Sequence, residues 1–183
     1  LVKDSVSGRN LYIAADRLLA YDEMEEIHRV KGSDLVGKTY EPLFRYFADK
    51  VTEGGFVVVS DAYVTTDSGT GIVHQAPAFG ADDYRVLRAH DIAAFACPVT
   101  MQGVFTDEVA DFAGQYVKDA DKEIIKHLKD SGALFRQETI QHSYPYCYRS
   151  DTPLIYRAVP SWYVNVTSTG ERLLAANEQI RWV

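Results

Sequence analysis

Cysteine is scarce in this chain of 183 residues, which holds only Cys97 and Cys147, far apart in the sequence. Two such cysteines do not make the disulfide framework of a small secreted domain, and a reducing compartment fits them best. Neither is part of a C-x-x-C pair, and four zinc ligands cannot be assembled from these two cysteines and His142. We therefore expect no metal, and Cys147 is interpreted as a small buried hydrophobe.

Long apolar runs and an excess of positive charge are also missing. No run approaches the roughly 20 residues that a membrane-spanning helix needs, and the chain does not open with a signal peptide. The formal net charge of −7 argues against a general nucleic-acid binder, which shows a basic face. Contact with a few nucleotides at an RNA end stays open, because stacking and base edges dominate there. Membranes and DNA are therefore not expected as partners.

Glycine-rich nucleotide-binding motifs are absent as well, and the pattern of short apolar segments points to another fold class. Residues 56–60 are the best strand in the sequence, because they are short and β-branched. Further strands are predicted at residues 11–14, 63–66, 71–74, 135–144 and 156–166, with 43–48 as a strand or a helical turn. Pro160 makes the last of these a bent or edge strand.

Helices are expected at residues 16–21, 82–90 and 118–131, with Asp16 and Asp119 as caps and Gly132 closing the last one. The helices fall irregularly between the strands. The chain has the length of one domain. This pattern favours an α+β fold with a mixed or barrel-like β-sheet and a few flanking helices.

The segment richest in chemistry spans residues 69–86 and reads Gly-Thr-Gly-Ile-Val-His-Gln-Ala-Pro-Ala-Phe-Gly-Ala-Asp-Asp-Tyr-Arg-Val. Its first glycines allow backbone angles or close approaches that side chains would block. We expect the loop to bring four side chains toward one rim: His74, Phe79, Asp82 and Asp83. A histidine and a carboxylate so placed can bind an ammonium, orient a water or transfer a proton. Equally open from the residues alone is a helix start with two acidic residues and an ordinary loop histidine.

This segment closely resembles the editing-site motif of isoleucyl-tRNA synthetases. Valyl and leucyl relatives share the Gly-Thr-Gly-x-Val opening and a later aspartate, but not the His-Gln-Ala-Pro phrase. Residues 111–121, 142–156 and 158–162 resemble the eukaryotic-type cytosolic isoleucyl enzyme. The resemblance covers nearly the whole chain and is weakest over residues 1–55. It implies one editing domain over residues 1–183, cut at its N-terminus, with about 155–183 returning toward the synthetic domain.

The resemblance also implies a function, the hydrolysis of the ester that joins valine to mischarged tRNA(Ile) in the cytoplasm. One methylene group changes the binding free energy by only about 1–3 kcal/mol, and the discrimination between isoleucine and valine by isoleucyl-tRNA synthetases is the standard case of this limit. A second, hydrolytic site that rejects the wrong product is therefore needed. The partners implied are the aminoacylated 3′ end of tRNA(Ile) and the synthetic domain. No cofactor is implied in this domain, whereas the parent enzyme uses ATP and Mg.

The family's site residues carry over position by position. Asp83 matches the carboxylate that holds the α-ammonium of the misattached amino acid, and His74 matches a residue that shapes the pocket to admit valine and exclude isoleucine. The pocket walls correspond to Gly69, Thr70, Gly71 and Phe79. None of these is a strong base, so we expect the substrate and a water to be positioned, with backbone donors stabilising the oxyanion.

The chain also departs from the family. A threonine-rich segment lies just before the matching start in the family, and residues 65–66 are on a different element and do not replace it. The ATP-binding motifs of the synthetic domain are absent too. The alternative is therefore an incomplete, non-catalytic editing fragment that binds the aminoacyl-adenosine end without turnover. A free-standing hydrolase is disfavoured, because no Ser/His or Cys/His arrangement is present.

Overall fold

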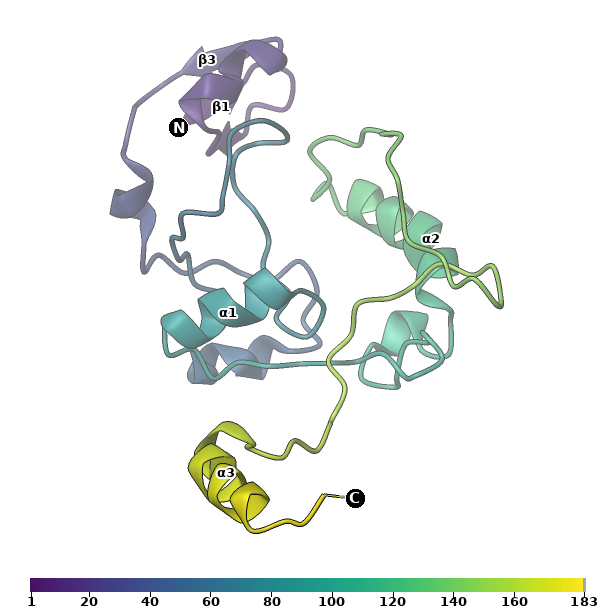
Figure 1. The fold of residues 1–183 in the computed structure, drawn as a ribbon. Helices are drawn as coiled ribbons and strands as arrows, with labels where there is room; N and C mark the ends of the chain where they lie inside the picture. The colour runs from purple at the N-terminus through teal and green to yellow at the C-terminus, as the bar shows by residue number, and fades with distance from the viewer. Residues whose placement is uncertain (183) are drawn as a thin grey trace.

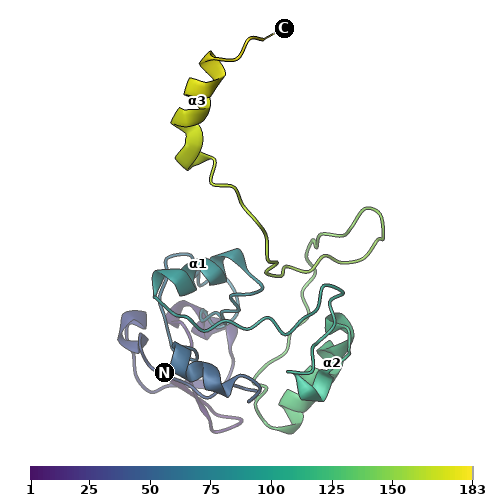
Figure 2. The ribbon, with the colours of Figure 1, turned by 90° about the horizontal axis from the view of Figure 1, so that it is seen from below.

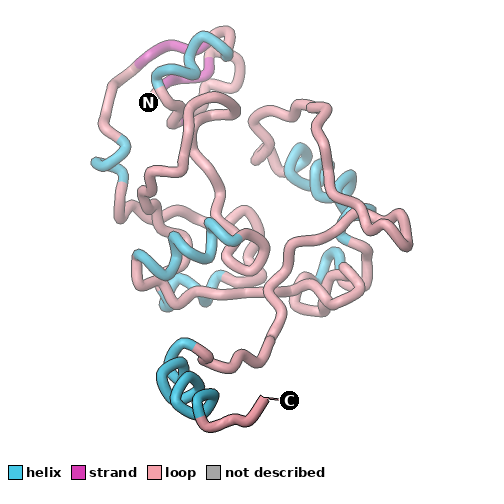
Figure 3. The backbone as a smooth tube through the Cα atoms, viewed as in Figure 1, coloured by secondary structure: helices cyan, strands magenta, loops and turns pink. Residues whose placement is uncertain are grey.

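The computed structural model describes residues 1–182, so the last residue of the predicted return segment lies outside the described part. Most of the backbone is loop (Figure 3). The helices and strands are β1 (Val2–Asp4), β2 (Asn10–Leu11), β3 (Met24–Glu26), α1 (Ala81–Ala89), α2 (Val117–Asp130) and α3 (Gly170–Glu178) (Figure 1). Short 3₁₀ helices lie between them: η1 (Ala15–Ala20), η2 (Gly32–Leu35), η3 (Ala48–Glu53), η4 (Ala110–Phe112) and η5 (Thr167–Thr169).

The sheet is open and antiparallel, with the strand order β2-β1-β3. Val2 pairs with Leu11 on one side and with Glu26 on the other, and its side chain is buried. The α+β class is confirmed, but the mixed or barrel-like sheet is wrong, since the described residues form only this three-stranded sheet. A larger sheet needs segments whose backbone groups pair in ladders, and the other predicted strands lack such partners.

Positive backbone angles interrupt two of the predicted strands. Phe56 has φ +57°, so residues 56–60 pair with residues 37–40 only over an isolated bridge between Thr39 and Val57 and the adjoining backbone hydrogen bonds. Gly71 has φ +75°, which takes residues 71–74 out of strand geometry at their first position. Both angles lie in the left-handed region, where a regular strand does not continue.

The remaining predicted strands form no ladder in the described chain beyond Leu11, which pairs with Val2. Residues 11–14 keep only Leu11 in β2, because the Ala14 N–H donates to the loop carbonyl of Thr70 rather than to β1. Residues 43–48 form a turn that leads into η3, and residues 63–66 are turn and loop. Within the described chain, residues 135–144 make no backbone–backbone hydrogen bond. Residues 156–166 make one backbone hydrogen bond to another segment of the described chain, from the Ala158 N–H to the carbonyl of Ala78 at 2.6 Å. The guanidinium of Arg157 adds a side-chain hydrogen bond to the carbonyl of Val99, also at 2.6 Å.

The predicted helices fare better than the strands. Residues 82–90 and 118–131 are helical within one residue at each end, as α1 and α2, and Gly132 follows α2 with φ +70° as predicted. The predicted caps are wrong, because neither aspartate occupies the N-cap position. The N-caps are Ala14 for η1 and Tyr116 for α2, neither with a side-chain cap hydrogen bond. Residues 16–21 form the 3₁₀ helix η1, in which Asp16 accepts a hydrogen bond from Thr66.

Helix α3 was not predicted, and it stands apart from the rest of the molecule at the end of an extended segment (Figure 2). Every residue from 171 to 182 is exposed. The apolar side chains in and after it therefore have no core contact within the described chain. Because helix stability in proteins comes mainly from packing of an apolar face, α3 depends on local propensity here.

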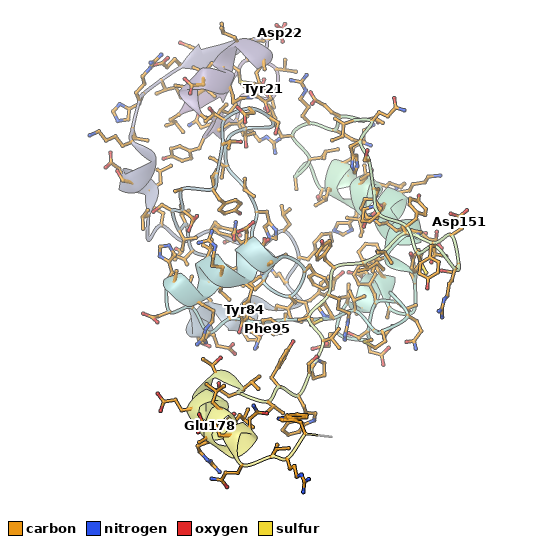
Figure 4. All side chains as sticks on the ribbon, in the orientation of Figure 1. Tyr21, Asp22, Tyr84, Phe95, Asp151 and Glu178 are labelled. Carbon is orange, nitrogen blue, oxygen red and sulfur yellow. The ribbon has the colours of Figure 1, made fainter. Side chains whose placement is uncertain are left out.

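The apolar core is small and lies under α2. Phe112, Val109 and Ala120 are buried there, and partly buried side chains packed against them are Phe44, Tyr46, Phe47, Phe105 and Ile124. The ring of Phe44 meets that of Phe112 edge-on, with the centroids 6.0 Å apart. A second contact links Tyr84 of α1 to Phe95, whose ring centroids are 6.4 Å apart (Figure 4).

No helix formed by residues 1–182 is long and apolar enough to cross a membrane.

Candidate functional site

All predicted site residues lie on one loop, residues 61–80, or in the first turn of α1. The loop runs from the α1 side of the molecule to the N-terminal sheet and back (Figure 1). Its tip, at residues 67–71, lies against η1. Asp83 lies at the other end of the loop, in the first turn of α1. The site therefore has two parts, which are held by different elements.

The tip is held by residues that precede and open η1. The guanidinium of Arg17 donates from Nε to the carbonyl of Gly69 at 3.0 Å and from Nη1 to the carbonyl of Asp67 at 3.1 Å. The Ala14 N–H donates to the carbonyl of Thr70 at 2.8 Å. A Cβ added at Gly71, which has φ +75°, would lie 2.5 Å from the Ala14 Cβ. Glycine is required at position 71 both for the angle and for the close approach.

The helix end of the loop is held by Asp83. Its Oδ1 accepts a hydrogen bond from the Ala76 N–H at 2.7 Å, and its Oδ2 occupies the space that a Cβ at Gly80 would fill. Gly80 is the N-cap of α1 and has φ −151°, an ordinary extended angle, so this glycine provides space rather than backbone freedom. The Phe79 N–H donates to the carbonyl of Ala76 at 2.8 Å, which closes the turn between them.

An ion pair beside Asp83 fixes α1 to the start of the loop. Both terminal nitrogens of Arg85 donate to the carboxylate of Asp61 at 2.9 Å, and its Nε contacts Asp82 at 3.4 Å. The hydrogen bonds from Arg85 and from the Tyr63 N–H lower the pKa of Asp61 to about 2. Arg85 is thus paired with the carboxylates of Asp61 and Asp82, whereas Asp83 makes no ion pair with any of residues 1–182.

Other side chains complete this face. The amide of Gln75 donates from Nε2 to the hydroxyl of Tyr63. The guanidinium of Arg85 lies over the ring of Tyr63, 5.9 Å from its centroid, which adds a cation–π contact. His74 is exposed and makes no hydrogen bond within the described chain. Its imidazole is therefore free to contact a ligand.

A cavity of about 320 Å³ adjoins the loop tip. Gly71, Ile72 and Thr66 form one side, and the lining on the other side comes from β1, η1 and residues 26–35. Neither His74, Phe79 nor Asp83 lines it. The described residues therefore bring Gly71 to a cavity and the carboxylate of Asp83 to the helix start, and they do not enclose all the predicted site residues in one pocket.

Sequence reasoning missed the residues that hold the site. Arg17 and Ala14 lie some fifty positions before the loop tip, and no local pattern marks them. Asp61 gave no signal either, since its role depends on the distant Arg85. The role of Gly80 had a signal, because a residue three positions before an acidic residue in the first helical turn can face its carboxylate.

No group of three or more histidine, cysteine, aspartate or glutamate side chains among residues 1–182 is placed to hold a metal ion. Cys147 is only half-buried, which corrects the expectation of a buried hydrophobe. Hydrogen bonds from Ser150 and from neighbouring backbone groups lower the pKa of its thiol.

Comparison with known proteins gives a clear relationship. No family model matches the chain. The isoleucine–tRNA ligase of Bdellovibrio bacteriovorus is 52% identical over 187 residues, which cover all of this chain and 18% of that protein. The cytoplasmic isoleucine–tRNA ligase of Caenorhabditis elegans is 49% identical, over all of this chain and 17% of that protein, and the Arabidopsis thaliana one is 54% identical, over 90% and 14%. The chain belongs to the isoleucine–tRNA ligase family. It spans less than a fifth of the length of these relatives.

Membership of the isoleucine–tRNA ligase family confirms the resemblance, including that to cytoplasmic eukaryotic forms. The downstream stretch 111–121 has a structural role, since it forms the end of η4 and the start of α2. Its Asp111 accepts a hydrogen bond from the hydroxyl of Tyr46. Burial and this hydrogen bond raise the pKa of Tyr46 to about 12. Family similarity therefore extends over scaffold and loop alike.

Proposed function

We propose that this chain is the proofreading part of an isoleucine–tRNA ligase and hydrolyses the ester of valine mischarged onto tRNA(Ile). Water adds to the ester carbonyl, the bond to the ribose oxygen breaks, and that oxygen takes up a proton as valine leaves. Such a reaction needs no bound cofactor, whereas ATP and Mg serve amino-acid activation elsewhere in the parent enzyme. The partners would be the aminoacylated 3′ end of tRNA(Ile) and the synthetic domain, in the cytoplasm.

The uncompensated charge of Asp83 carries this proposal. Its carboxylate is held by the Ala76 N–H and by the space over Gly80, so its position is fixed without a cation. The nearby Arg85 is neutralised by Asp61 and Asp82. A fixed, half-exposed carboxylate with no cationic partner in the described chain suits the α-ammonium of an aminoacyl ester, because a charge-assisted hydrogen bond is about twice as strong as a neutral one.

The other predicted residues complete the proposal. His74 is exposed and without a hydrogen bond in the described chain, so it can contact the substrate and limit the size of the side chain admitted. Phe79 is partly buried in the turn that Asp83 holds through the Ala76 N–H. The walls formed by Gly69, Thr70 and Gly71 would come from the loop tip. Substrate binding would bring the two parts of the site around one ester, with catalysis by positioning rather than by a strong base.

The experiment that tests the proposal removes the carboxylate charge from the protein and, separately, the ammonium charge from the substrate. Valyl-tRNA(Ile) is compared with N-acetylvalyl-tRNA(Ile), which has no ammonium, using the wild-type chain, Asp83→Asn and the matched control Asp82→Asn. Loss of a charge-assisted hydrogen bond of about 1.5–3 kcal/mol predicts about 10- to 100-fold slower hydrolysis of the valyl ester by Asp83→Asn. The N-acetyl ester should be hydrolysed slowly and equally by all three proteins. An equal effect of Asp83→Asn on both esters would refute ammonium recognition.

The separation of the two site parts favours one alternative, a fragment that binds the aminoacyl-adenosine end without turnover. The cavity at the loop tip includes Gly71 but not Asp83. If this alternative holds, a non-hydrolysable valyl-adenosine binds in titration calorimetry and Asp83→Asn weakens it, while the ester is not hydrolysed.

A further inference from the structure

The turn at the loop tip presents its carbonyl groups to one side. Arg17 binds the carbonyls of Asp67 and Gly69, at 3.1 and 3.0 Å, and the Ala14 N–H binds the carbonyl of Thr70 at 2.8 Å. Three carbonyls of residues 67–70 are therefore held against the residues that begin η1. A bond from the Thr66 hydroxyl to Asp16, at 3.2 Å, ties the same two segments together once more.

The planarity of the peptide decides where the amides point. In a trans peptide the carbonyl and the following N–H point in opposite directions. Because the Gly69 carbonyl faces Arg17, the N–H of Thr70 faces away from it; because the Thr70 carbonyl faces Ala14, the N–H of Gly71 also faces away. Neither N–H makes a hydrogen bond with any residue in the described chain. The turn therefore offers two adjacent free donors on its outer side.

We propose that the Thr70 and Gly71 amides form an oxyanion-binding site and that Arg17 is the residue that positions it. Successive backbone N–H groups next to a left-handed residue form an anion-binding concavity, and Gly69 has φ +55°. The inference rests on the proposed function and extends it. When water adds to the ester carbonyl, the carbonyl oxygen gains the negative charge, and the two amides stabilise it until the ribose oxygen leaves.

Arginine suits this role and lysine does not. The planar guanidinium reaches two carbonyls at once with donors in a fixed fork, whereas an ammonium is a single point charge on a flexible stem. The two acceptors of Arg17 lie two residues apart on the turn, so a single donor leaves one peptide free to rotate. Arg17→Lys should therefore keep the charge and lose the orientation of the amides.

The kinetic test uses a full-length isoleucine–tRNA ligase in which this chain replaces the matching segment. Arg17→Lys and Arg17→Ala are compared with Arg172→Ala, an exposed arginine of α3. Removal of one oxyanion donor costs about 100- to 1,000-fold in kcat, and donors that remain but move should cost roughly tenfold. KM should hardly change, because the oxyanion exists only near the transition state. A raised KM with unchanged kcat would overturn the positioning role.

A second readout does not depend on turnover. The ¹⁵N-labelled chain is titrated with valyl-adenosine analogues that carry either a phosphonate, a tetrahedral anion, or a neutral planar amide in place of the ester. The Thr70 and Gly71 amide protons should move downfield with the phosphonate only, and Arg17→Lys should abolish that difference. Unmoved amides overturn the inference even if the ester is hydrolysed. Moved amides without hydrolysis uphold it and refute the hydrolytic function instead.

Discussion

The substitution Gly80→Ala isolates the interaction that holds Asp83. The backbone angles at this position, φ −151° and ψ 137°, suit alanine as well as glycine, so no backbone strain arises. The new Cβ would occupy the place of the Asp83 Oδ2, and the carboxylate must move away from the Ala76 N–H. Gly80→Ala therefore breaks the hydrogen bond between the Ala76 N–H and Asp83 without changing the aspartate itself.

The magnitude follows from three contributions. A hydrogen bond to a charged group contributes about 1.5–3 kcal/mol, and the partial exposure of Asp83 places this one at the lower end. Alanine is a poorer N-cap than glycine by roughly 0.5–1 kcal/mol. Alanine also restricts the unfolded chain, which stabilises the folded state by about 0.4–1 kcal/mol and offsets the cost of the poorer N-cap. We expect Gly80→Ala to lower the free energy of unfolding by about 1.5 kcal/mol.

The assay is urea unfolding of the four proteins of a double-mutant cycle, with Asp83→Ala as the second change. In the Asp83→Ala background Gly80→Ala should cost almost nothing, which gives a coupling energy of about 1.5 kcal/mol. Gly170→Ala is the control, because its φ is −55° and a Cβ there meets nothing within 4 Å; it should stabilise the fold by about 0.4–1 kcal/mol. An equal cost of Gly80→Ala in both backgrounds would refute the reasoning.

Three further predictions follow from the contacts of single side chains. The hydrogen bonds from Arg85 lower the pKa of Asp61 to about 2 from 3.8, so the contribution of this ion pair to stability is complete above about pH 4 and is lost as the pH falls through 2. The free energy of unfolding of Asp61→Asn, measured by urea titration, should therefore depend less on pH in this window than that of the wild type. An unchanged slope would contradict this reasoning. Phe112→Ala should lower the free energy of unfolding in urea by about 3–5 kcal/mol, because Phe112 lies in the core. Trp162 is fully exposed, so Trp162→Ala should leave this free energy unchanged. Equal effects of the two substitutions would show that Phe112 is not a core residue. Gly71→Ala should lower the free energy of unfolding, measured by heat or urea, by at least about 1–2 kcal/mol, because alanine is strained at the left-handed angle and its Cβ would clash with Ala14. A neutral result would mean that the loop tip does not have this conformation.

Helices α1 and α2 were predictable because their signals are local, whereas α3 was not predicted. An apolar stripe and a terminal Gly132 define α2, and acidic residues in a first turn define α1. The caps failed because Asp16 and Asp119 lie inside the first turns rather than before them. Position relative to the first helical residue, and not residue type alone, decides whether a side chain can cap a helix.

Strands were poorly predictable because a strand is defined by its partner. Residues 56–60 have strong β propensity, yet the positive φ of Phe56 and the short partner segment limit them to a single bridge. Residues 135–144 and 156–166 have suitable side chains but no ladder in the described chain. Propensity measures how a residue fits a pleated surface and does not supply the neighbouring strand.

The residues assigned to the candidate site remain predictions from the sequence, and the contacts that support them could not be predicted. The motif of residues 69–86 stands out in the sequence, and its resemblance assigns roles that remain predictions. What holds it is long-range: Arg17 reaches the tip, and Asp61 engages Arg85. A single sequence contains no signal for contacts between residues so far apart.

The most direct test of the account compares hydrolysis of valyl-tRNA(Ile) with that of isoleucyl-tRNA(Ile). The assay uses this chain and a full-length isoleucine–tRNA ligase that carries it, each with its Asp83→Ala variant. The account predicts selective hydrolysis of the valyl ester by the ligase and loss of that activity in Asp83→Ala, with folding unchanged by circular dichroism. Equal hydrolysis of both esters, or full valyl-ester hydrolysis by the ligase carrying Asp83→Ala, would contradict it.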